Sequence, residues 1–299
     1  ILIYFLIVLS SPMLFTLERG NLILIAPVFL ALAISKIGMV RSLNIALLIN
    51  IKPYFALLIF YYVARENWKG FATCSALSGL IFLILGLALD NNFLVFFTNL
   101  FAFSQDAILF SIREVMALPS SISAFSYILK HPDGAMFAES FLSLQTIQII
   151  VFLVEIAKWS ALAISLAALF MRSSQMRDAE VFVLLVVVIS NLGIWVGGYT
   201  YILYIALIPV VIKMRQNWLY MGLISLMAIP LDIVPLLGTA IGTQYSYLAS
   251  ENVEVFWTMG MGSVIRPNAN LALLLLLSYE FFTRKNESKS NDTVRHVGF

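Results

Sequence analysis

The stretch Ser42-Leu-Asn-Ile-Ala-Leu-Leu-Ile-Asn-Ile-Lys52-Pro53-Tyr-Phe-Ala-Leu-Leu-Ile-Phe-Tyr-Tyr-Val63 decides how this chain folds. It is long and apolar enough to cross a bilayer core of about 30 Å once. Lys52 and Pro53 divide it, however, and proline both removes a helical hydrogen bond and clashes with the preceding turn. The run therefore either crosses a membrane once or enters and returns as two half-helices.

The rest of the chain is similarly apolar. Of its 299 residues, 61% are hydrophobic and only 11% are charged, and the mean hydropathy is +0.96. Soluble domains carry roughly 25% charged residues, so we expect an all-α polytopic membrane protein. It should contain about eight transmembrane helices, plus a re-entrant or broken helix pair near Lys52-Pro53. Besides the end of another run at 1–16, the apolar runs lie at about 22–36, 69–89, 143–170, 179–195, 199–213, 218–237 and 264–283.

Positive charge distinguishes between the two topologies. Lys36 and Arg41 precede the broken run, and Arg65 and Lys69 follow it. Positive residues prefer cytoplasmic loops, and both clusters lie there only if the run enters and returns. This arrangement places 12 of the 18 Lys and Arg residues inside, four outside and two within the membrane. Lys52 would then lie at the apex of a re-entrant pair and face a wet pocket, because irregular backbone at membrane depth must line a cavity or be buried in protein.

This topology also assigns the two sides of the protein. Residues 1–283 form a single transmembrane domain, and residues 284–299 form a polar cytoplasmic tail. The segment 90–142 lies outside and is too long for a plain connector. Its periodic apolar residues predict interfacial amphipathic helices. The chain starts inside an apolar stretch without a charged leader, so we expect natural sequence to precede Ile1.

Polar residues before the run at 22–36 form the first candidate site. Arg19 and Gly20 precede a helix that is expected to begin at Asn21. The free amide groups of a helix N-terminus bind anions, and the planar guanidinium of arginine matches phosphate. An interfacial Glu18–Arg19 pair, with Asn21 as an ordinary helix cap, accounts for the same spacing.

Three further cations lie in or beside apolar runs. Lys52, followed by Tyr54, needs a partner at mid-depth: a carboxylate, backbone carbonyls or a substrate phosphate. A structural pair or a side chain that extends to the interface is the alternative. Arg266 lies at the outer end of the last predicted span, 264–283, and either binds a phosphate or caps the helix. Lys158 has Glu155 three residues before it on the same helical face, so we expect a self-satisfied pair.

The sequence offers no legible metal or cofactor site. It lacks HxxxH, HExxH and DxD motifs, a Walker motif and a GxGxxG motif. A single cysteine, Cys74, excludes an internal disulfide and a cysteine-based metal cluster. We therefore expect no cofactor, no metal and no nucleic acid partner.

Three motifs in residues 12–70 carry a family resemblance. They are Pro12-Met-Leu-Phe-Thr-Leu-Glu-Arg-Gly-Asn21, then Ile51-Lys-Pro-Tyr54, and then the basic loop Arg65-Glu-Asn-Trp-Lys69. Together they resemble the bacterial membrane glycosyltransferases of family 87, which belong to the GT-C superfamily and include polyprenyl-phosphate-dependent mannosyltransferases. Gly197-Gly-Tyr199 is also similar to the family.

The resemblance implies a GT-C-like bundle that works at the outer face of the plasma membrane. It implies transfer of a hexose such as mannose from a polyprenyl-phosphate donor to a glycan or glycolipid acceptor. Glu18, Arg19 and Asn21 would line the outer cavity, and Lys52 or Arg19 would meet the phosphate. Family members carry the catalytic base, an aspartate, in the first outer loop. No residue of this chain matches that aspartate, so the catalytic residue is unknown.

Two other functions use the same features. Broken helices and buried cations also build substrate sites in secondary transporters and flippases for polar or anionic substrates, although the sequence shows no internal repeat. A polysaccharide polymerase or ligase of related architecture would use a lipid-linked oligosaccharide instead of a single sugar.

Overall fold

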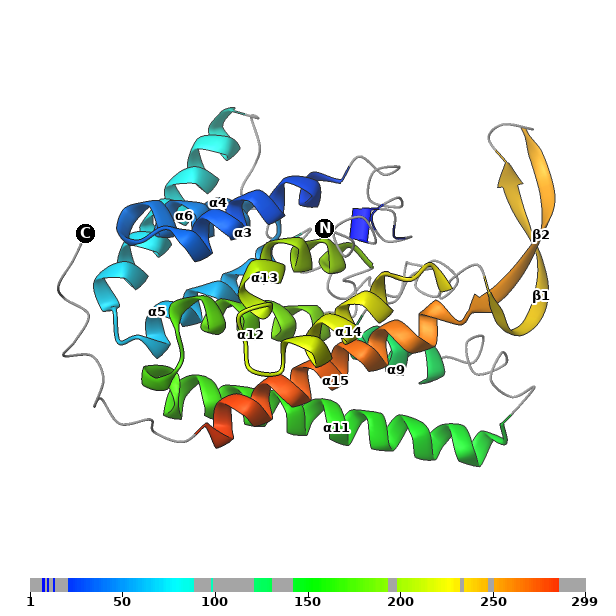
Figure 1. Cartoon of the computed structure of the whole chain (residues 1–299). Coiled ribbons are helices and arrows are strands. Elements are labelled where there is room, and N and C mark those ends of the chain that lie inside the picture. The colour runs from blue at the N-terminus through cyan, green and yellow to red at the C-terminus, as the bar shows by residue number, and fades with distance from the viewer. Residues whose placement is uncertain are drawn as a thin grey trace.

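The computed structural model describes residues 21–88, 121–130, 142–192, 198–231, 234–246 and 250–284, together with residues 7, 8, 10, 13 and 98. Within these residues the protein is mostly helical (Figure 1). Glu18 and Arg19 lie outside the described residues. So do the tail after Arg284 and most of the predicted outer segment 90–142.

The helices follow the seven full apolar runs and the broken run at 42–63, and one more, α9, lies in the predicted outer segment. The first half contains η1 (Leu22–Ile25), α3 (Ala26–Ser35), α4 (Gly38–Ile51), η2 (Pro53–Ile59), α5 (Phe60–Ala64), α6 (Trp68–Ala88) and α9 (Ile122–Lys130). The second half contains α11 (Leu144–Met171), η4 (Ser173–Gln175), α12 (Asp178–Leu192), η5 (Gly198–Leu203), α13 (Tyr204–Val211), α14 (Asn217–Ala228) and α15 (Gly262–Thr283). The run predicted at 218–237 ends early, because Pro230 cannot continue a helix.

One region corrects the all-α prediction. Strands β1 (Pro235–Ser246) and β2 (Glu251–Gly260) pair in an antiparallel hairpin, with Thr243 opposite Glu254. Ser250, beside the turn, adopts the left-handed region with φ 55°. The segment carries Thr, Val and aromatic residues, which suit strands, and glycines, which disfavour helices. The all-helical prediction was therefore wrong for this part of the predicted outer segment 238–263.

Two helices, α6 and α11, are long and apolar enough to cross a membrane. Five further apolar helical stretches among the described residues have 10–17 residues, fewer than the roughly 20 that a full crossing needs. They are Leu22–Ser35, Gly38–Ile51, Pro53–Ala64, Thr200–Val211 and Asn217–Ala228. The complete bundle of about eight spans therefore stays a prediction.

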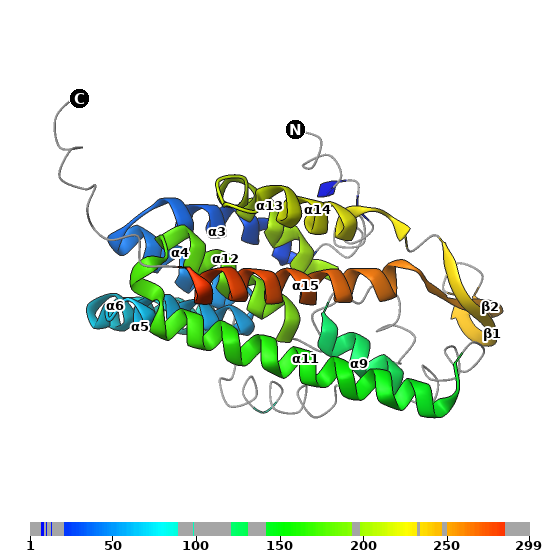
Figure 2. The same cartoon turned by 60° about the horizontal axis from the view of Figure 1, so that its bottom comes forward.

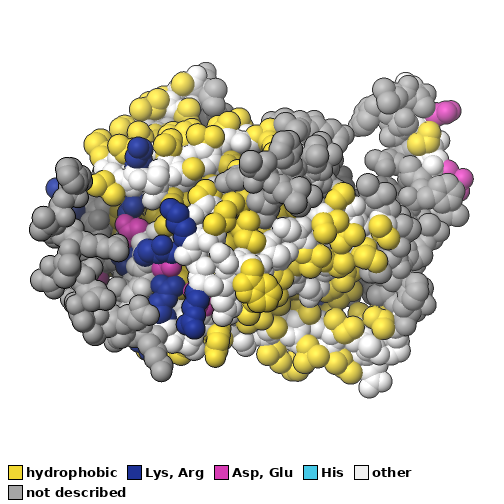
Figure 3. All heavy atoms as spheres, viewed as in Figure 1, with side chains coloured by type: hydrophobic (Ala, Val, Ile, Leu, Met, Phe, Trp, Pro, Cys, Tyr) yellow, Lys and Arg dark blue, Asp and Glu magenta, His cyan; other side chains and the backbone are white. Residues whose placement is uncertain are grey.

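Helices α11 and α15 run side by side between two opposite ends of the molecule (Figures 1 and 2). The end that holds the β-hairpin and the starts of α11 and α15 is called the hairpin end. The other is called the charged end, because nine of the 13 described Lys and Arg residues lie there, at helix termini (Figure 3). They are Lys36, Arg41, Arg65, Lys69, Arg172, Arg177, Lys213, Arg215 and Arg284.

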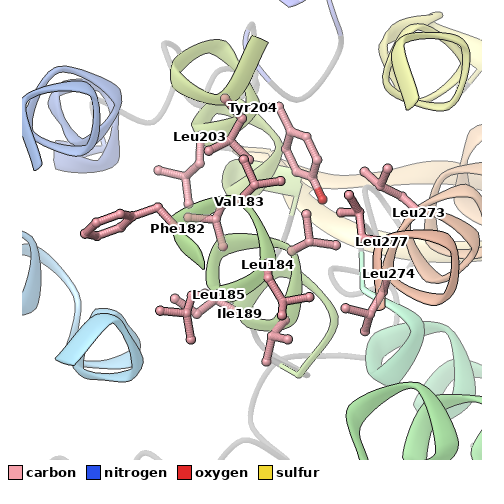
Figure 4. Packing of buried hydrophobic residues seen from close by; sticks show 14 of the residues in the cluster. Phe182, Val183, Leu184, Leu185, Ile189, Leu203, Tyr204, Leu273, Leu274 and Leu277 are labelled. Atoms are coloured by element: carbon pink, nitrogen blue, oxygen red, sulfur yellow. The ribbon is translucent and has the colours of Figure 1, made fainter. Parts of the chain in front are cut away.

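Helix α12 lies at the centre of the core. Twelve of its 15 residues are buried, which is typical of a helix surrounded by others. Its side chains pack against Leu203 and Tyr204 on one side and against Leu273, Leu274 and Leu277 of α15 on another (Figure 4). Helix α6 is the opposite case, because large apolar side chains such as Leu83 and Leu87 remain exposed along it. Such faces mark contact with lipid or with another protein.

Candidate functional site

The run predicted to be broken at Lys52-Pro53 is broken in the structure. Helix α4 ends at Ile51, Lys52 has an extended backbone (φ −148°, ψ 125°), and η2 begins at Pro53. Arg41, near the start of α4, and Arg65, at the end of α5, both bind Asp178, with N–O distances of 2.8 and 3.1 Å. The two halves therefore return to one end of the molecule. The helix break is confirmed, and the entry of this pair into a membrane from the cytoplasmic side stays a prediction.

The apex of this helix pair lies level with the middle of α6. Two residues before Lys52, the side-chain amide of Asn50 donates to the backbone oxygen of Ser78 at 3.1 Å and approaches its hydroxyl at 3.4 Å. Ser78 is the eleventh of the 21 residues of α6. At 1.5 Å per residue, the apex is about 15 Å from either end of that helix. Lys52 thus lies near the mid-depth of a helix long enough to cross a membrane.

The ammonium group of Lys52 has no partner within the part of the chain that the structure describes. The side chain is partly exposed, and Nζ forms no hydrogen bond or ion pair with any residue that the structure describes. The backbone of the apex is satisfied, because Lys52 N donates to Leu48 O at 3.0 Å and Phe55 N donates to Lys52 O at 3.1 Å. Tyr54, also partly exposed, packs its ring against Phe55 with centroids 4.8 Å apart. An anion bound here would neutralise a cation at a depth where charge is costly.

Asn21 acts as a helix cap. Its Oδ1 accepts a hydrogen bond from Ile23 N at 3.1 Å, at the start of η1. The cap interpretation of the sequence accounts for this contact. The other two predicted residues of this group, Glu18 and Arg19, lie outside the described residues.

Arg266 lies inside the bundle, near the hairpin end. Its side chain is 1% exposed, and Nε donates to Met227 O at the end of α14 at 3.2 Å. It is the fifth residue of α15, which begins at Gly262, so it does not cap the helix. Within the described structure, no hydrogen bond or ion pair joins Lys52, Tyr54 or Asn21 to another predicted site residue.

Sequence analysis missed a buried polar cluster one helical turn beyond Arg266. Asn270 Oδ1 accepts from the Tyr204 hydroxyl at 2.5 Å, and Asn270 Nδ2 donates to Ser190 O at 3.2 Å. Asn191 Nδ2 donates to Asn270 O at 3.3 Å, and Ser123 Oγ donates to Asn191 O at 3.0 Å. These bonds join α9, α12, α13 and α15. The available signal was the pair of asparagines inside apolar runs, where an amide needs a partner.

The Lys158–Glu155 pair predicted from the spacing is confirmed. Lys158 Nζ lies 2.6 Å from Glu155 Oε2. Glu155 also accepts from Ser126 at 2.5 Å, Lys130 at 3.0 Å and Trp159 at 3.2 Å. Because Ser126 and Lys130 belong to α9, the carboxylate anchors that helix to α11. Lys158 therefore has a structural role.

A second unpredicted feature is the acidic residue that closes the base of the helix pair. Tyr61 donates to Asp178 Oδ2 at 2.7 Å, and the Arg41 guanidinium lies 4.6 Å from the centre of the Tyr61 ring. Burial opposes the charged form of Asp178. Hydrogen bonds from Tyr61 and Arg41, and the charges of Arg41 and Arg65, outweigh it and hold the pKa of this carboxyl below its usual value.

The described residues thus contain a partly exposed lysine at a helix break and a separate buried polar cluster near Arg266. Among the described residues, no group of three or more His, Cys, Asp and Glu side chains could hold a metal ion. Comparison with known proteins yields no match: no family model, no curated protein and no solved structure is similar to this chain. The resemblance to family 87 accordingly stays a prediction from its motifs.

Proposed function

We propose that this protein is a membrane glycosyltransferase. It moves a hexose, such as mannose, from a polyprenyl-phosphate donor to a glycan or glycolipid acceptor at the outer face of the plasma membrane. One observation carries the proposal. The ammonium group of Lys52, without an anionic partner among the described residues, lies at the apex of a broken helix pair level with the middle of α6. A lipid-linked sugar brings its phosphate to the protein from within the membrane.

The distribution of charge supports the orientation. Nine of the 13 described Lys and Arg residues lie at the charged end, and positive residues favour the cytoplasmic side. The hairpin end then faces outward, and the chain leaves α15 at Arg284 on the cytoplasmic side. In this orientation the donor phosphate enters from the bilayer, and the acceptor approaches from the hairpin end.

Lys52 has a defined role in this reaction. It binds the donor phosphate and stabilises the negative charge that develops as the glycosyl–phosphate bond breaks. Arg19 assists it, as the motif resemblance implies, and Tyr54 flanks the phosphate. A carboxylate must accept the proton of the acceptor hydroxyl as the hydroxyl attacks the sugar. We assign that role to no described residue.

Binding of a short-chain polyprenyl phosphate to the full chain in nanodiscs tests the proposal. Lys52→Ala should raise the Kd by about tenfold or more, because it removes a charge-assisted contact. Lys52→Arg should retain most of the affinity. The control is Lys130→Ala, which removes an exposed lysine that is already bound to Glu155. Equal affinity of Lys52→Ala and the unaltered protein would refute the assignment of Lys52.

The second candidate is a secondary transporter or flippase, which the same broken helix pair favours. Flux measurements in sealed vesicles distinguish the two. A transporter moves a labelled polyprenyl phosphate or phosphosugar across the membrane chemically unchanged. A glycosyltransferase releases polyprenyl phosphate and labels the acceptor.

A further inference from the structure

Four exposed cations at the charged end have no carboxylate partner within the described residues. They are Lys36, Lys69, Lys213 and Arg215. Four other arginines at this end are bound to Asp178, Glu180 or Glu280, namely Arg41, Arg65, Arg177 and Arg284. The first four therefore leave positive charge open to an outside partner. They are called the open cations below.

Each open cation lies within three residues of a large exposed apolar side chain. Ile37 next to Lys36 is 77% exposed, and Trp68 next to Lys69 is 62% exposed. Ile212 precedes Lys213 and is 49% exposed, and Trp218 follows Arg215 and is 75% exposed. Solvent or a polar soluble partner would pair with the charges but leave these apolar side chains exposed to water. An interface between water and hydrocarbon suits both kinds of side chain.

The four positions are gathered at the charged end and are called the row below. They lie at termini of helices that pack in series: α6 packs against α4, α4 against α3, and α3 against α13. Figure 3 shows Lys and Arg side chains gathered at this end of the molecule, with apolar side chains spread over the rest of the face. Trp68 is also the first residue of α6, a helix long enough to cross a membrane, so the row lies where that helix would leave the bilayer.

We propose that the row of open cations binds the anionic headgroups of membrane lipids. The lipid phosphates neutralise the cations, and the adjacent tryptophan and isoleucine side chains enter the headgroup region. Each Lys or Arg close to an anionic surface strengthens binding by about fivefold. This inference depends on the membrane location in the proposed function and is independent of sugar transfer.

Quenching of tryptophan fluorescence by brominated lipids measures the preference in a protein that keeps only Trp68 and Trp218, the two tryptophans beside the open cations, with Phe in place of Trp159, Trp195 and Trp257. The full chain is reconstituted in bilayers in which either phosphatidylglycerol or phosphatidylcholine is brominated. The ratio of the two quenching curves gives the relative binding constant. The unaltered protein should prefer the anionic lipid by about fivefold or more at low salt. The preference should weaken at 1 M salt, where the screening length is about 3 Å.

A charge-removing variant and a charge-preserving variant test the assignment to these residues. Lys36→Gln/Lys69→Gln/Lys213→Gln/Arg215→Gln should lower the preference to near one. The matched control Lys36→Arg/Lys69→Arg/Lys213→Arg/Arg215→Lys should keep it. All four side chains are exposed, so circular dichroism should show the same helix content in each protein. The proposal is overturned if the charge-removing variant keeps the preference, or if both variants lose it equally. Loss of sugar transfer by Lys52→Ala leaves this result unchanged, so the two proposals fail separately.

Discussion

Lys52 and Lys158 both lie in apolar helical runs, but their side chains differ in burial and in whether they have an acidic partner. Lys158 is buried and lies 2.6 Å from Glu155, three residues earlier in the same helix. Lys52 is partly exposed at a helix break, and no described residue offers it a carboxylate. A cation with its own partner contributes to the fold. A cation at similar depth without one is the better candidate for a ligand.

The largest effect expected from this comparison is on catalysis. Lys52→Ala should lower kcat/KM for sugar transfer by about 100-fold, because the contact acts on charge that develops in the transition state. The resemblance predicts a similar loss for Arg19→Ala. Release of polyprenyl phosphate from a polyprenyl-phosphate hexose by the purified protein measures the rate. A rate near that of the unaltered protein in both variants would remove both residues from the site, and Lys130→Ala serves as the control.

For stability the comparison predicts the opposite order. Changes at the Glu155–Lys158 pair should have a larger effect on the free energy of unfolding than a change at Lys52. Glu155→Ala leaves Lys158 buried without its anion and should lower the free energy of unfolding by about 2 kcal/mol. Replacing both residues, in Glu155→Leu/Lys158→Met, should recover the part of this loss that comes from the unpaired lysine. The buried Ser126 hydroxyl, which donates to Glu155, stays unpaired in both variants. Lys52→Met should change stability little.

Denaturation of the purified protein in detergent micelles measures these differences. A loss for Lys52→Met as large as that for Glu155→Ala would mean that Lys52 also has a structural partner. The distinction between the two lysines would then fail.

The sequence predicted the local features of this comparison and missed the distant ones. Pro53 predicts the helix break, and the i, i+3 spacing predicts the Glu155–Lys158 pair. Both predictions succeed because the interactions concerned act within one helical turn. Asp178 could not be foreseen as the partner of Arg41, which lies 137 residues away in the chain. The β-hairpin was missed because short apolar runs do not by themselves distinguish strand from helix.

The free energy of unfolding should fall in acid because of Asp178, which lies at the base of the Lys52 helix pair. Because the pKa of Asp178 is lower in the folded protein than in the unfolded chain, its ionised form stabilises the fold. That contribution is complete above the unfolded pKa of about 3.9 and is lost as the pH falls through the lower folded value.

Asp178→Asn sharpens this prediction. It should lower the free energy of unfolding by about 1 kcal/mol at pH 7, since the carboxylate is 43% exposed and partly screened by solvent. The difference from the unaltered protein should stay constant down to about pH 5 and shrink at lower pH. A difference that is equally large at pH 3 and pH 7 would assign the effect to packing.

The smallest effect concerns the turn through which the returning half of the pair enters α6. Glu66 adopts a left-handed backbone with φ 52°, which costs a residue with a side chain more than it costs glycine. Glu66→Gly should therefore raise the free energy of unfolding by about 0.5 kcal/mol, after the greater freedom of glycine in the unfolded chain is subtracted. Glu66→Ala removes the same charge but keeps a Cβ, so it should give no gain. If alanine stabilises as much as glycine, removal of the glutamate side chain, and not relief of its left-handed backbone, accounts for the gain.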